Sequence, residues 1–394
     1  MKKIIIVFGT RPEAIKLIPV INAFLLYPSK FKIIICVTAQ HRQMLDQVLE
    51  LFNIVPHYDM DIMSNNQDLF DVTISILDNF KKILKAEQPD MIIVQGDTTT
   101  TFAASLAAFY FKIPIGHVEA GLRTYSKYQP FPEEKNRHMT TVIADYHFAP
   151  TEWARQNLLK EGISEDMIWV TGNTSIDALL EIVNKLKSTK IQEEMALFFL
   201  NQYGLIFNNS NDNAYKKIIL VTGHRRENFG LGFKNICMAL KEIGRKNPDI
   251  IIIYPVHLNP NVRKPVFEIF GYNENNLSHN IQNIYLIEPL DYIHFVYLMC
   301  NCYCILTDSG GIQEEALSLN KPILIMRDTT ERPEGVNSGG AKLVGTDYDV
   351  IVNETQKILD DKDVYQKMSN IKNPYGDGKA ASKIAKVIHD IEEI

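Results

Sequence analysis

The stretch that decides the fold is Ile305-Leu-Thr-Asp-Ser-Gly-Gly-Ile-Gln-Glu-Glu-Ala316. The apolar, β-branched run at 302–307 predicts a buried strand, residues 308–311 a tight turn, and residues 312–318 a helix. A strand that passes directly into a helix is typical of a parallel sheet covered by helices. The segment therefore predicts an α/β fold with a polar turn at the end of one strand.

This turn has the features of a phosphate-binding site. Gly310 and Gly311 let the backbone approach a ligand without a Cβ in the way. The first N–H groups of the following helix have no intrahelical partner, and the helix dipole adds about half a positive charge. Ser309, Gly310 and Gly311 are therefore predicted to hold phosphate, and Glu315 to accept a hydrogen bond from a sugar hydroxyl. The alternative is an ordinary strand–helix turn with Ser309 as its N-cap.

Strand-like and helix-like runs alternate along almost the whole chain, which predicts parallel sheets with helices on both faces. Expected strands lie near 3–9, 32–38, 90–95, 114–118, 145–149, 167–171, 217–222, 249–255, 283–287, 302–307 and 322–326. Expected helices lie near 13–26, 40–52, 67–86, 98–111, 133–144, 151–161, 174–187, 232–246, 260–270, 291–300, 312–319, 348–361 and 379–392.

Two such sets predict two Rossmann-like, doubly wound domains that face a central cleft. The first covers residues 1–175, and the second covers residues 176–374. The last helix, within 375–394, is expected to pack back on the first domain. A chain of 394 residues is long enough for two cores of ordinary size.

Composition excludes several classes of protein. The apolar fraction is 46%, the charged fraction 22% and the net charge -6, so a nucleic-acid or anionic-membrane surface is not favoured. No window reaches 18 uncharged apolar residues, and the apolar run in 1–8 is too short for a signal peptide, so we expect a cytoplasmic protein. Cys300, Cys302 and Cys304 are predicted to lie on one face of a strand as buried free thiols and not as a metal site.

Polar or glycine-containing stretches follow five of the expected strands. They are residues 9–13, 96–98, 117–123, 223–227 and 308–311. In open α/β sheets ligands bind at the carboxyl ends of the strands, so these stretches predict a ligand between the domains. The first of them has one glycine where a dinucleotide fingerprint needs three, which argues against NAD; no cofactor and no metal are expected.

The first half supplies candidate acids for catalysis. Asp97, Glu119 and Glu133 each follow a strand or begin a helix on the cleft side, and together they form a trio of carboxylates. These acids could instead have structural roles. Asp97 could be an N-cap, and Glu133 or Glu134 could interact with the helix dipole.

Basic and aromatic candidates occur in both halves. Arg11 and Lys16, one turn apart, are candidate anion contacts or else a solvated pair. His224 and Arg225 open the second half of the cleft and would meet a phosphate, whereas His257 is as consistent with a structural role. The remaining candidates are Arg137 in the helix that begins at residue 133, Phe295 to bracket a base, and Arg332 to clamp phosphate or carboxylate.

Longer motifs carry a family resemblance. They are Phe8-Gly-Thr-Arg-Pro-Glu-Ala-Ile-Lys16, Val37-Thr-Ala-Gln-His-Arg-Gln-Met-Leu-Asp-Gln47, Gly96-Asp-Thr-Thr-Thr-Thr101, Gly116-His-Val-Glu-Ala-Gly-Leu-Arg-Thr124, Thr222-Gly-His-Arg-Arg-Glu227, Tyr254-Pro-Val-His-Leu-Asn-Pro260, Thr307-Asp-Ser-Gly-Gly-Ile-Gln-Glu-Glu-Ala316, Met326-Arg-Asp-Thr-Thr-Glu-Arg-Pro-Glu334 and Asn373-Pro-Tyr-Gly-Asp-Gly378. The sequence resembles the non-hydrolysing, bacterial-type UDP-N-acetylglucosamine 2-epimerases, which interconvert UDP-GlcNAc and UDP-ManNAc. The resemblance covers essentially the whole chain and implies a GT-B-type fold and a homodimer.

The resemblance also implies roles for individual residues. Ser309, Gly310 and Gly311 would hold the diphosphate, and Glu315 the ribose. Contacts with the sugar, phosphate or uracil would come from Arg11, Lys16, Asp97, Glu119, Glu133, His224, Phe295 and Arg332. A second, activating UDP-GlcNAc would use Gln40, Gln43, Arg225 and His257. The chain departs from the family at two positions. Family members often have Gln where this sequence has Leu290, and some have Arg where it has Asn66.

The chemistry explains the need for these groups. The C2 hydrogen of the sugar is not acidic, so either a neighbouring carbon is oxidised with NAD or UDP leaves first. The glycine pattern disfavours NAD, and loss of UDP gives an oxocarbenium-like C1 and then a 2-acetamidoglucal. A carboxylate takes the C2 proton and another group returns one to the opposite face; residue types alone do not assign these two tasks among the three acids. A hydrolysing 2-epimerase, a GT-B glycosyltransferase and a catalytically silent nucleotide-sugar sensor are the competing hypotheses.

Overall fold

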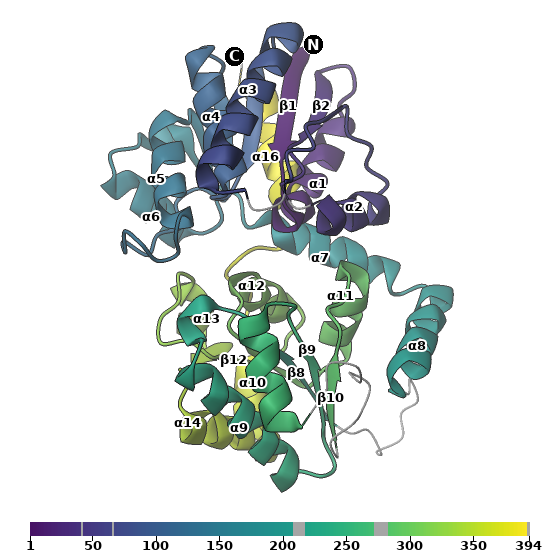
Figure 1. Ribbon diagram of the computed structural model, residues 1–394. Coiled ribbons are helices and arrows are strands. Elements are labelled where there is room, and N and C mark those ends of the chain that lie inside the picture. Colours follow the sequence, from purple (N-terminus) through teal and green to yellow (C-terminus); the bar gives the residue numbers. More distant parts are fainter. Residues whose placement is uncertain (41, 65–66, 208–216, 272–282, 392–394) are drawn as a thin grey trace. The chain divides into compact units, whose positions relative to one another are not determined.

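A computed structural model describes residues 1–40, 42–64, 67–207, 217–271 and 283–391. The chain forms two compact units, Met1–Ala178 with Tyr375–Ile394, and Leu179–Pro374 (Figure 1). The division falls inside helix α7 (Thr174–Lys185), the helix that also contains the boundary expected after residue 175.

Unit 1, the N-terminal unit, is built on a seven-stranded sheet in which all pairs are parallel, ordered β3-β2-β1-β4-β5-β6-β7. The strands are β1 Lys2–Phe8, β2 Phe31–Val37, β3 Tyr58–Asp59, β4 Met91–Gln95, β5 Ile115–Val118, β6 Tyr146–Ala149 and β7 Ile168–Val170. Its helices besides α7 are α1 Arg11–Leu25, α2 Arg42–Leu51, α3 Leu69–Glu87, α4 Thr99–Tyr110, α5 Glu133–Ile143, α6 Glu152–Lys160 and α16 Ala380–Asp390, with a 3-10 turn at Glu165–Met167. The central strands are buried on both faces, which is why they are continuously apolar.

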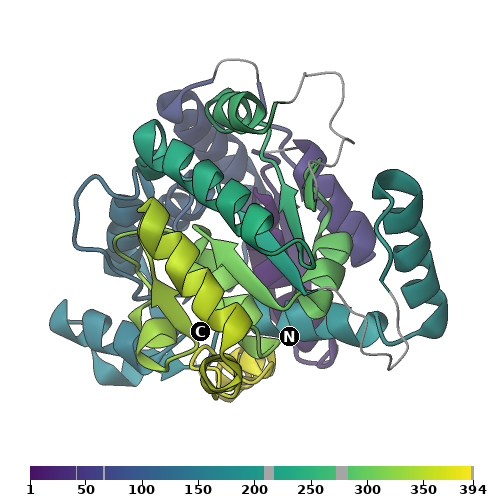
Figure 2. The ribbon, with the colours of Figure 1, turned by 90° about the horizontal axis from the view of Figure 1, so that it is seen from below.

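Unit 2 has a six-stranded parallel sheet, ordered β10-β9-β8-β11-β12-β13. Its strands are β8 Ile218–Thr222, β9 Ile251–Pro255, β10 Ile284–Ile287, β11 Cys304–Thr307, β12 Ile323–Ile325 and β13 Ala341–Leu343. Its helices are α8 Thr189–Tyr203, α9 Leu231–Lys246, α10 Pro260–Phe270, α11 Tyr292–Asn301, α12 Gly310–Ser318, α13 Pro333–Asn337, α14 Tyr348–Asp360 and α15 Lys362–Ser369, with a 3-10 turn at Arg226–Asn228. Helices α9 and α14 lie side by side across one face of the sheet (Figure 2).

Each sheet has one point at which the strand order reverses. In unit 1 the chain builds outward from β1 through β2 to β3 and then starts again at β4 on the other side of β1. In unit 2 the same reversal occurs between β8 and β11. The loops after such a pair of strands diverge, so a crevice for ligands forms at their carboxyl ends.

The C-terminal helix α16 belongs to unit 1, where it packs against α1 (Figure 1). The Asp177 carboxylate accepts the backbone N–H groups of Ala380 at 3.2 Å and Ala381 at 2.9 Å, which caps the helix. The Asn173 N–H also donates to the Tyr375 carbonyl at 2.7 Å. These contacts anchor the returning chain beside the start of α7.

Several sequence-based expectations are wrong in detail. Helices α8 and α15, the short α13 and the edge strands β3 and β13 were not expected, and α12 begins at Gly310, not at residue 312. Cys300 lies in α11, Cys302 is its C-cap and only Cys304 is in a strand, so the three thiols do not share a strand face. An apolar run alone does not distinguish the end of a buried helix from a buried strand. All five cysteines are free.

Among the helices of the described residues, none combines the length and the apolar character that crossing a bilayer requires.

Burial keeps two neighbouring histidines neutral in unit 1. His117 on β5 and His147 on β6 are register partners, and both are buried. The His117 Nε2–H donates to the Gly96 carbonyl oxygen at 2.7 Å. Burial lowers the pKa of His117 to about 4 and that of His147 to about 3. Both rings therefore carry no charge at neutral pH.

We expect unit 1 to lose stability as the pH falls from 7.5 to 5. A histidine whose folded-state pKa is depressed contributes stability that is present above its unfolded pKa and is lost as the pH falls towards the folded value. With an ordinary value of 6.5 and a folded value of about 4, His117 alone accounts for about 2 kcal/mol over this interval. Urea unfolding followed by Trp153 and Trp169 fluorescence measures it, because both tryptophans belong to unit 1.

The matched variant is His117→Gln, whose amide can still donate to Gly96 but does not titrate. Its loss of stability between the two pH values should be smaller than that of the parent by about 2 kcal/mol. The same pH dependence in both proteins would contradict the assignment.

Candidate active site

The predicted site residues divide between the crevices of the two units. Asp97 follows β4, and the Arg137 guanidinium on α5 forms an ion pair with its Oδ2. The neighbouring Asn136 side chain donates to the Asp97 carbonyl oxygen at 3.0 Å. Asp97 is not an N-cap, because Thr98 caps α4 by accepting the Thr101 N–H. Helix α5 therefore fixes both the backbone and the carboxylate of Asp97.

Glu119 lies after β5, and its side chain is 6% exposed. Lys16 on α1 forms an ion pair with Glu119 Oε2, and the Asn173 amide donates to the same oxygen at 3.0 Å. Glu119 has φ 65, a left-handed conformation that non-glycine residues rarely adopt. Lys16 is thus held by a carboxylate and is not a solvated surface charge, whereas Arg11 begins α1 and is half-buried.

The adjacent acids Glu133 and Glu134 differ in their surroundings. Glu134 is fully buried, accepts the Tyr125 N–H at 2.9 Å and lies 3.4 Å from Arg137 Nη1. It therefore has a structural role, holding the preceding loop and orienting Arg137. Glu133 begins α5 and is half-buried, which leaves part of its side chain accessible.

Sequence reasoning missed Glu13, a buried carboxylate that links two strand exits of unit 1. Its Oε2 accepts the Gly9 and Thr10 N–H groups at 3.0 and 2.8 Å, and its Oε1 accepts the Thr98 hydroxyl at 2.6 Å. Burial raises the pKa of Glu13, and these hydrogen bonds act in the opposite direction. The signal in the sequence is the capping box Thr10-x-x-Glu13. Glu13 ties the turn that carries Arg11 to the turn that carries Asp97.

Gln40, predicted for an activator site, also lies in unit 1, where its side chain accepts the Thr100 hydroxyl at 3.2 Å. The side chain of Gln43 lies outside the described part of the chain, as does residue 66, where the sequence departs from the family. The other two predicted activator contacts, Arg225 and His257, belong to unit 2.

In unit 2, Ser309 is in the N-cap position of α12, and Gly310 and Gly311 are the first two helical residues. Within the described structure the Ser309 hydroxyl caps no backbone N–H. The Ser309 N–H donates to the Thr307 hydroxyl oxygen at 2.9 Å. Ser309 therefore is the N-cap residue of α12, as the alternative expected, but its hydroxyl makes no capping hydrogen bond.

The two glycines have different surroundings. A Cβ on Gly310 would lie 2.4 Å from Arg332 Nη1, whereas a Cβ on Gly311 would meet no atom within 4 Å. Arg332 thus lies against the N-terminus of α12, and the backbone at Gly311 faces open space. A cation beside free helical N–H groups is a suitable arrangement for binding an anion.

A buried carboxylate organises the arginines of this region. Glu331 accepts Arg332 Nη1 at 2.5 Å and Arg327 Nη1 at 2.8 Å, and Arg225 Nη2 lies 3.7 Å from it. Burial alone would raise the pKa of Glu331, but the three guanidinium groups hold it well below its usual range. Glu314 on α12 forms a second ion pair with Arg332, which restricts the guanidinium from both sides.

The candidates for ribose and base contacts lie near α11. Glu315 is buried, and its Oε1 accepts the Tyr292 hydroxyl at 3.0 Å. Phe295 is half-buried on α11, one turn along from Tyr292. Leu290 is buried and precedes Asp291, the N-cap of α11.

His224 follows β8, and its side chain is 40% exposed. Its ring stacks on that of His257, with centroids 5.3 Å apart and planes at 16°. The buried Asp308 carboxylate oxygen Oδ1 lies 3.5 Å from the Nδ1 of His224. Partial burial lowers the pKa of His224; Asp308 acts to raise it, and Arg225 and His257 act to lower it.

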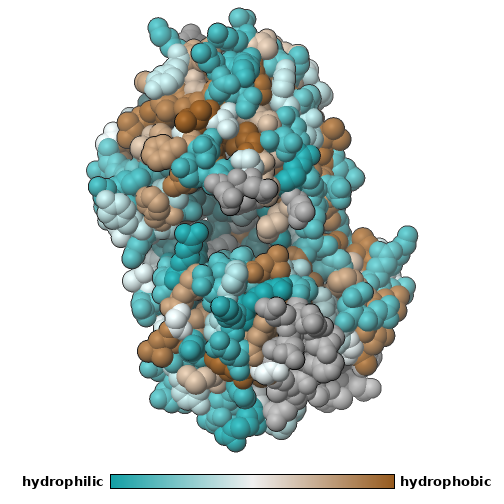
Figure 3. All heavy atoms as spheres, viewed as in Figure 1, coloured by the Kyte–Doolittle hydropathy of each residue, from teal (hydrophilic) through white to brown (hydrophobic). Residues whose placement is uncertain are grey.

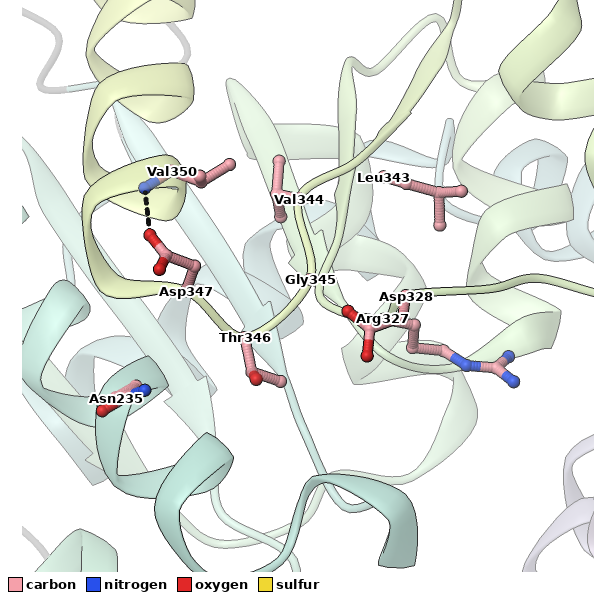
Figure 4. A pocket seen from close by; sticks show the side chains of 9 residues that line it. All are labelled: Asn235, Arg327, Asp328, Leu343, Val344, Gly345, Thr346, Asp347 and Val350. Atoms are coloured by element: carbon pink, nitrogen blue, oxygen red, sulfur yellow. Dashed lines mark hydrogen bonds between the residues drawn. The ribbon is translucent and has the colours of Figure 1, made fainter.

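A separate hollow of about 500 Å³ lies on unit 2, beside the exits of β12 and β13 (Figure 4). Its lining comes from Asn235, Arg327, Asp328, Leu343, Val344, Gly345, Thr346, Asp347 and Val350. The Asp347 carboxylate accepts the Val350 N–H at 3.0 Å as the N-cap of α14. The Arg327 guanidinium points away from the Asp347 carboxylate (Figure 4). The hollow gathers no set of catalytic groups. Across the described residues, no three His, Cys, Asp or Glu side chains are arranged to hold a metal ion.

The protein has two doubly wound units. One carries carboxylates where its strand order reverses, and the other carries a helix N-terminus and arginines. This arrangement places the protein in the GT-B class of nucleotide-sugar proteins. The family model described as UDP-N-acetylglucosamine 2-epimerase matches residues 27–389, and the chain belongs to this family.

Curated relatives and solved structures agree with this assignment. The chain is 54% identical over 387 residues to the UDP-N-acetylglucosamine 2-epimerase of Salmonella typhimurium, covering 98% of both chains. The structure matches the Neisseria meningitidis UDP-GlcNAc 2-epimerase bound to UDP-GlcNAc with a TM-score of 0.90 and 49% identity, over 98% of this chain and 99% of that one. It matches the Methanocaldococcus jannaschii enzyme, solved with UDP-GlcNAc and UDP, with a TM-score of 0.80 and 36% identity, over 98% and 99% of the two chains.

Gly310→Ala and Gly311→Ala form a matched pair that tests the environment of α12. Gly310→Ala should lower the free energy of unfolding by about 1–3 kcal/mol, because the new methyl overlaps a guanidinium that two carboxylates hold in place. Gly311→Ala should change it by less than about 1 kcal/mol or raise it, because alanine is the better helix former. Chemical denaturation of both variants measures the difference, and equal effects would contradict the described packing.

Proposed function

We propose that this protein catalyses the reversible epimerisation of UDP-N-acetylglucosamine at C2 to UDP-N-acetylmannosamine. The observation that carries the proposal is the match at 54% identity over 98% of the chain to an epimerase of this name. The Asp97–Arg137 ion pair in unit 1 and the open space at Gly311 in unit 2 support it. Relatives solved with UDP-GlcNAc or UDP support the same ligands here.

UDP binds to unit 2. The diphosphate accepts hydrogen bonds from the N-terminus of α12 at Ser309, Gly310 and Gly311, and Arg332 adds a positive charge. This is supported by the open space at Gly311 and by the guanidinium beside Gly310. Glu315 binds the ribose, as its buried and oriented carboxylate favours, and the uracil lies by Phe295.

The sugar is processed by the acids of unit 1. The C1–O bond breaks and its electron pair leaves with UDP, and a carboxylate among Asp97, Glu119 and Glu133 removes the C2 proton to give 2-acetamidoglucal. UDP then adds back at C1 while a proton returns to the opposite face of C2, so atoms and charge balance without a cofactor. Lys16 and Arg137 are supported as orienting groups by their ion pairs with Glu119 and Asp97.

His224 and the arginines of unit 2 stabilise the charge that develops on the leaving diphosphate. The helix N-terminus contributes to the same stabilisation without reorganising, because its N–H groups are fixed by the fold. Arg11 contacts the nucleotide sugar from unit 1, at the start of α1.

Further proposals concern regulation, assembly and location. A second UDP-GlcNAc activates the enzyme through Gln40, Gln43, Arg225 and His257. The protein is a homodimer, which is supported by exposed apolar side chains of unit 1 on α3, α4 and α5 (Figure 3). These are Phe70, Ile74, Phe109, Tyr110 and Val142. The five free cysteines support a reducing, cytoplasmic location.

The direct test is NMR of purified protein with UDP-GlcNAc in deuterated water. We expect UDP-ManNAc to form and deuterium to enter C2, with no acceptor or added metal. Release of UDP with free ManNAc would replace the proposal by a hydrolysing 2-epimerase. A requirement for an acceptor, with C2 unlabelled, would replace it by a glycosyltransferase, and binding without turnover by a sensor.

Asp97→Asn, Glu119→Gln and Glu133→Gln should each lower kcat by about 100-fold or more, because each removes a group that transfers or directs a proton. Glu193→Gln, on the exposed surface of α8, is the control and should retain parental activity. The rate of C2 exchange in the four variants measures the effect. Parental exchange in all three acid variants would exclude these acids from the chemistry.

Activation by a second ligand predicts a sigmoidal dependence of the rate on UDP-GlcNAc concentration. Gln40→Ala should make this dependence hyperbolic while leaving the rate at saturation within about 10-fold of the parent, since the coupling between sites is typically 5–150-fold in affinity. Initial rates over a wide concentration range measure it. A hyperbolic parent would contradict the second site.

A further inference from the structure

Asp308 is a fully buried acid whose two oxygens have different surroundings. Its Oδ2 accepts the backbone N–H groups of His224 and Arg225, each at 2.8 Å, and the Asn228 amide at 3.2 Å. Its Oδ1 is equally buried but has no hydrogen-bond partner among the described residues. His224 Nδ1 lies 3.5 Å from Oδ1.

This asymmetry is unusual because a buried carboxylate oxygen without a donor is unfavourable. The three bonds to Oδ2 restrain the carboxylate and leave Oδ1 3.5 Å from His224 Nδ1. The 3.5 Å separation exceeds that of a hydrogen bond, but catalytic hydrogen bonds often shorten only when substrate binds. A small rotation of a partly exposed ring is enough to close the gap.

We propose that Asp308 is a positioning residue, which holds His224 with Nδ1–H towards the carboxylate and Nε2 directed away from it. The inference rests on the function proposed above for His224 and adds a partner that determines its tautomer and charge. The ring then presents Nε2 to the leaving diphosphate. With a proton from solvent on Nε2, the ring donates this N–H to the leaving diphosphate, and the Asp308 carboxylate balances the positive charge of the ring.

The other groups that face His224 oppose this effect. Arg225 and His257 both disfavour a second positive charge on the ring, as does its partial burial, and only Asp308 favours it. His257 is stacked face to face on His224, and its own Nδ1 accepts the Asn259 N–H at 3.1 Å. Asp308 is therefore the one group among these that acts to raise the pKa of His224.

The geometry also indicates the variant that separates this role from a structural one. In Asp308→Asn the carbonyl oxygen can keep the three donors now bound to Oδ2. The amide NH₂ then replaces Oδ1 and offers a donor to His224 Nδ1. This reverses the polarity of the contact, so the ring should change to the Nε2–H tautomer and lose the compensating charge while the turn remains intact.

The experiment is two-bond ¹H–¹⁵N NMR of protein labelled with ¹⁵N-histidine, in which His224→Gln assigns one of the ten histidines. We expect neutral His224 in the parent to be the Nδ1–H tautomer. In Asp308→Asn we expect the Nε2–H tautomer and a titration midpoint lower by about 1 pH unit or more. An Nε2–H tautomer in the parent would overturn the proposal even if the variant failed to fold, and an unchanged tautomer and midpoint in a folded variant would overturn it as well.

Kinetics provide the second readout. Asp308→Asn should lower kcat by about 100-fold and shift the pH–rate profile, with the Kd for UDP within about 3-fold of the parent, because the α12 N-terminus is unchanged. A parallel loss of UDP binding would indicate a merely structural role. If the parent shows the expected tautomer but no C2 exchange, the proposed function fails and the Asp308–His224 pairing stands; if exchange occurs while the tautomer is insensitive to Asp308, only the present inference fails.

Discussion

In each sheet the first strand pairs in parallel with the strand that starts the other half of the sheet, β1 with β4 and β8 with β11. Both crevices depend on this pairing. In unit 2 the pairing of β8 with β11 sets Thr222 opposite Thr307, and their hydroxyl oxygens are 2.6 Å apart. Because this register is fixed, the residue after Thr307 meets the backbone that follows Thr222. Asp308 can therefore hold the loop of His224 and, one residue later, begin the turn into α12. In unit 1 the pairing of β1 with β4 brings two polar turns together in the same way, and Glu13 bridges them.

Charge is balanced by opposite means in the two units. In unit 1 the acids at the strand exits are compensated by cations on helices, Lys16 for Glu119 and Arg137 for Asp97. In unit 2 the arginines are compensated by buried acids, Glu331 and Glu314. Buried ion pairs contribute little net stability, but each partner loses its conformational freedom. Both units thus hold charged groups in fixed orientations, as preorganised stabilisation of a transition state requires.

Much of the fold could be predicted from the sequence because most strands of both sheets are buried on both faces and are therefore continuous apolar runs. The edge strands β3 and β13 are two and three residues long and carry no such signal. Helix α8 was missed, although aromatic side chains such as Phe199, which stacks on Tyr297 of α11, anchor it within unit 2. That contact is tertiary, and no local sequence pattern predicts it.

The candidate site could be predicted in so far as it follows strand exits, since those positions are set by the alternation of strands and helices. What the sequence could not supply is which polar groups meet. Glu134 and Glu133 are neighbours in the chain, yet one is fully buried by the loop it holds and the other is half-buried. Asp308 could be placed in a turn. Its contact with His224, however, joins two residues that are 84 positions apart in the chain and follow different strands. Such pairings depend on sheet register, which residue types do not encode locally.

The central claim is that the diphosphate is held by the first N–H groups of α12. The most direct measurement is a titration with UDP of protein labelled with ¹⁵N-glycine, in which the Gly310→Ala and Gly311→Ala variants each assign one of the twenty glycine amide signals. The account predicts large, saturable shifts of the Gly310 and Gly311 amides, because a charged acceptor binds to them directly. Saturable binding of UDP that leaves both signals in place would contradict it.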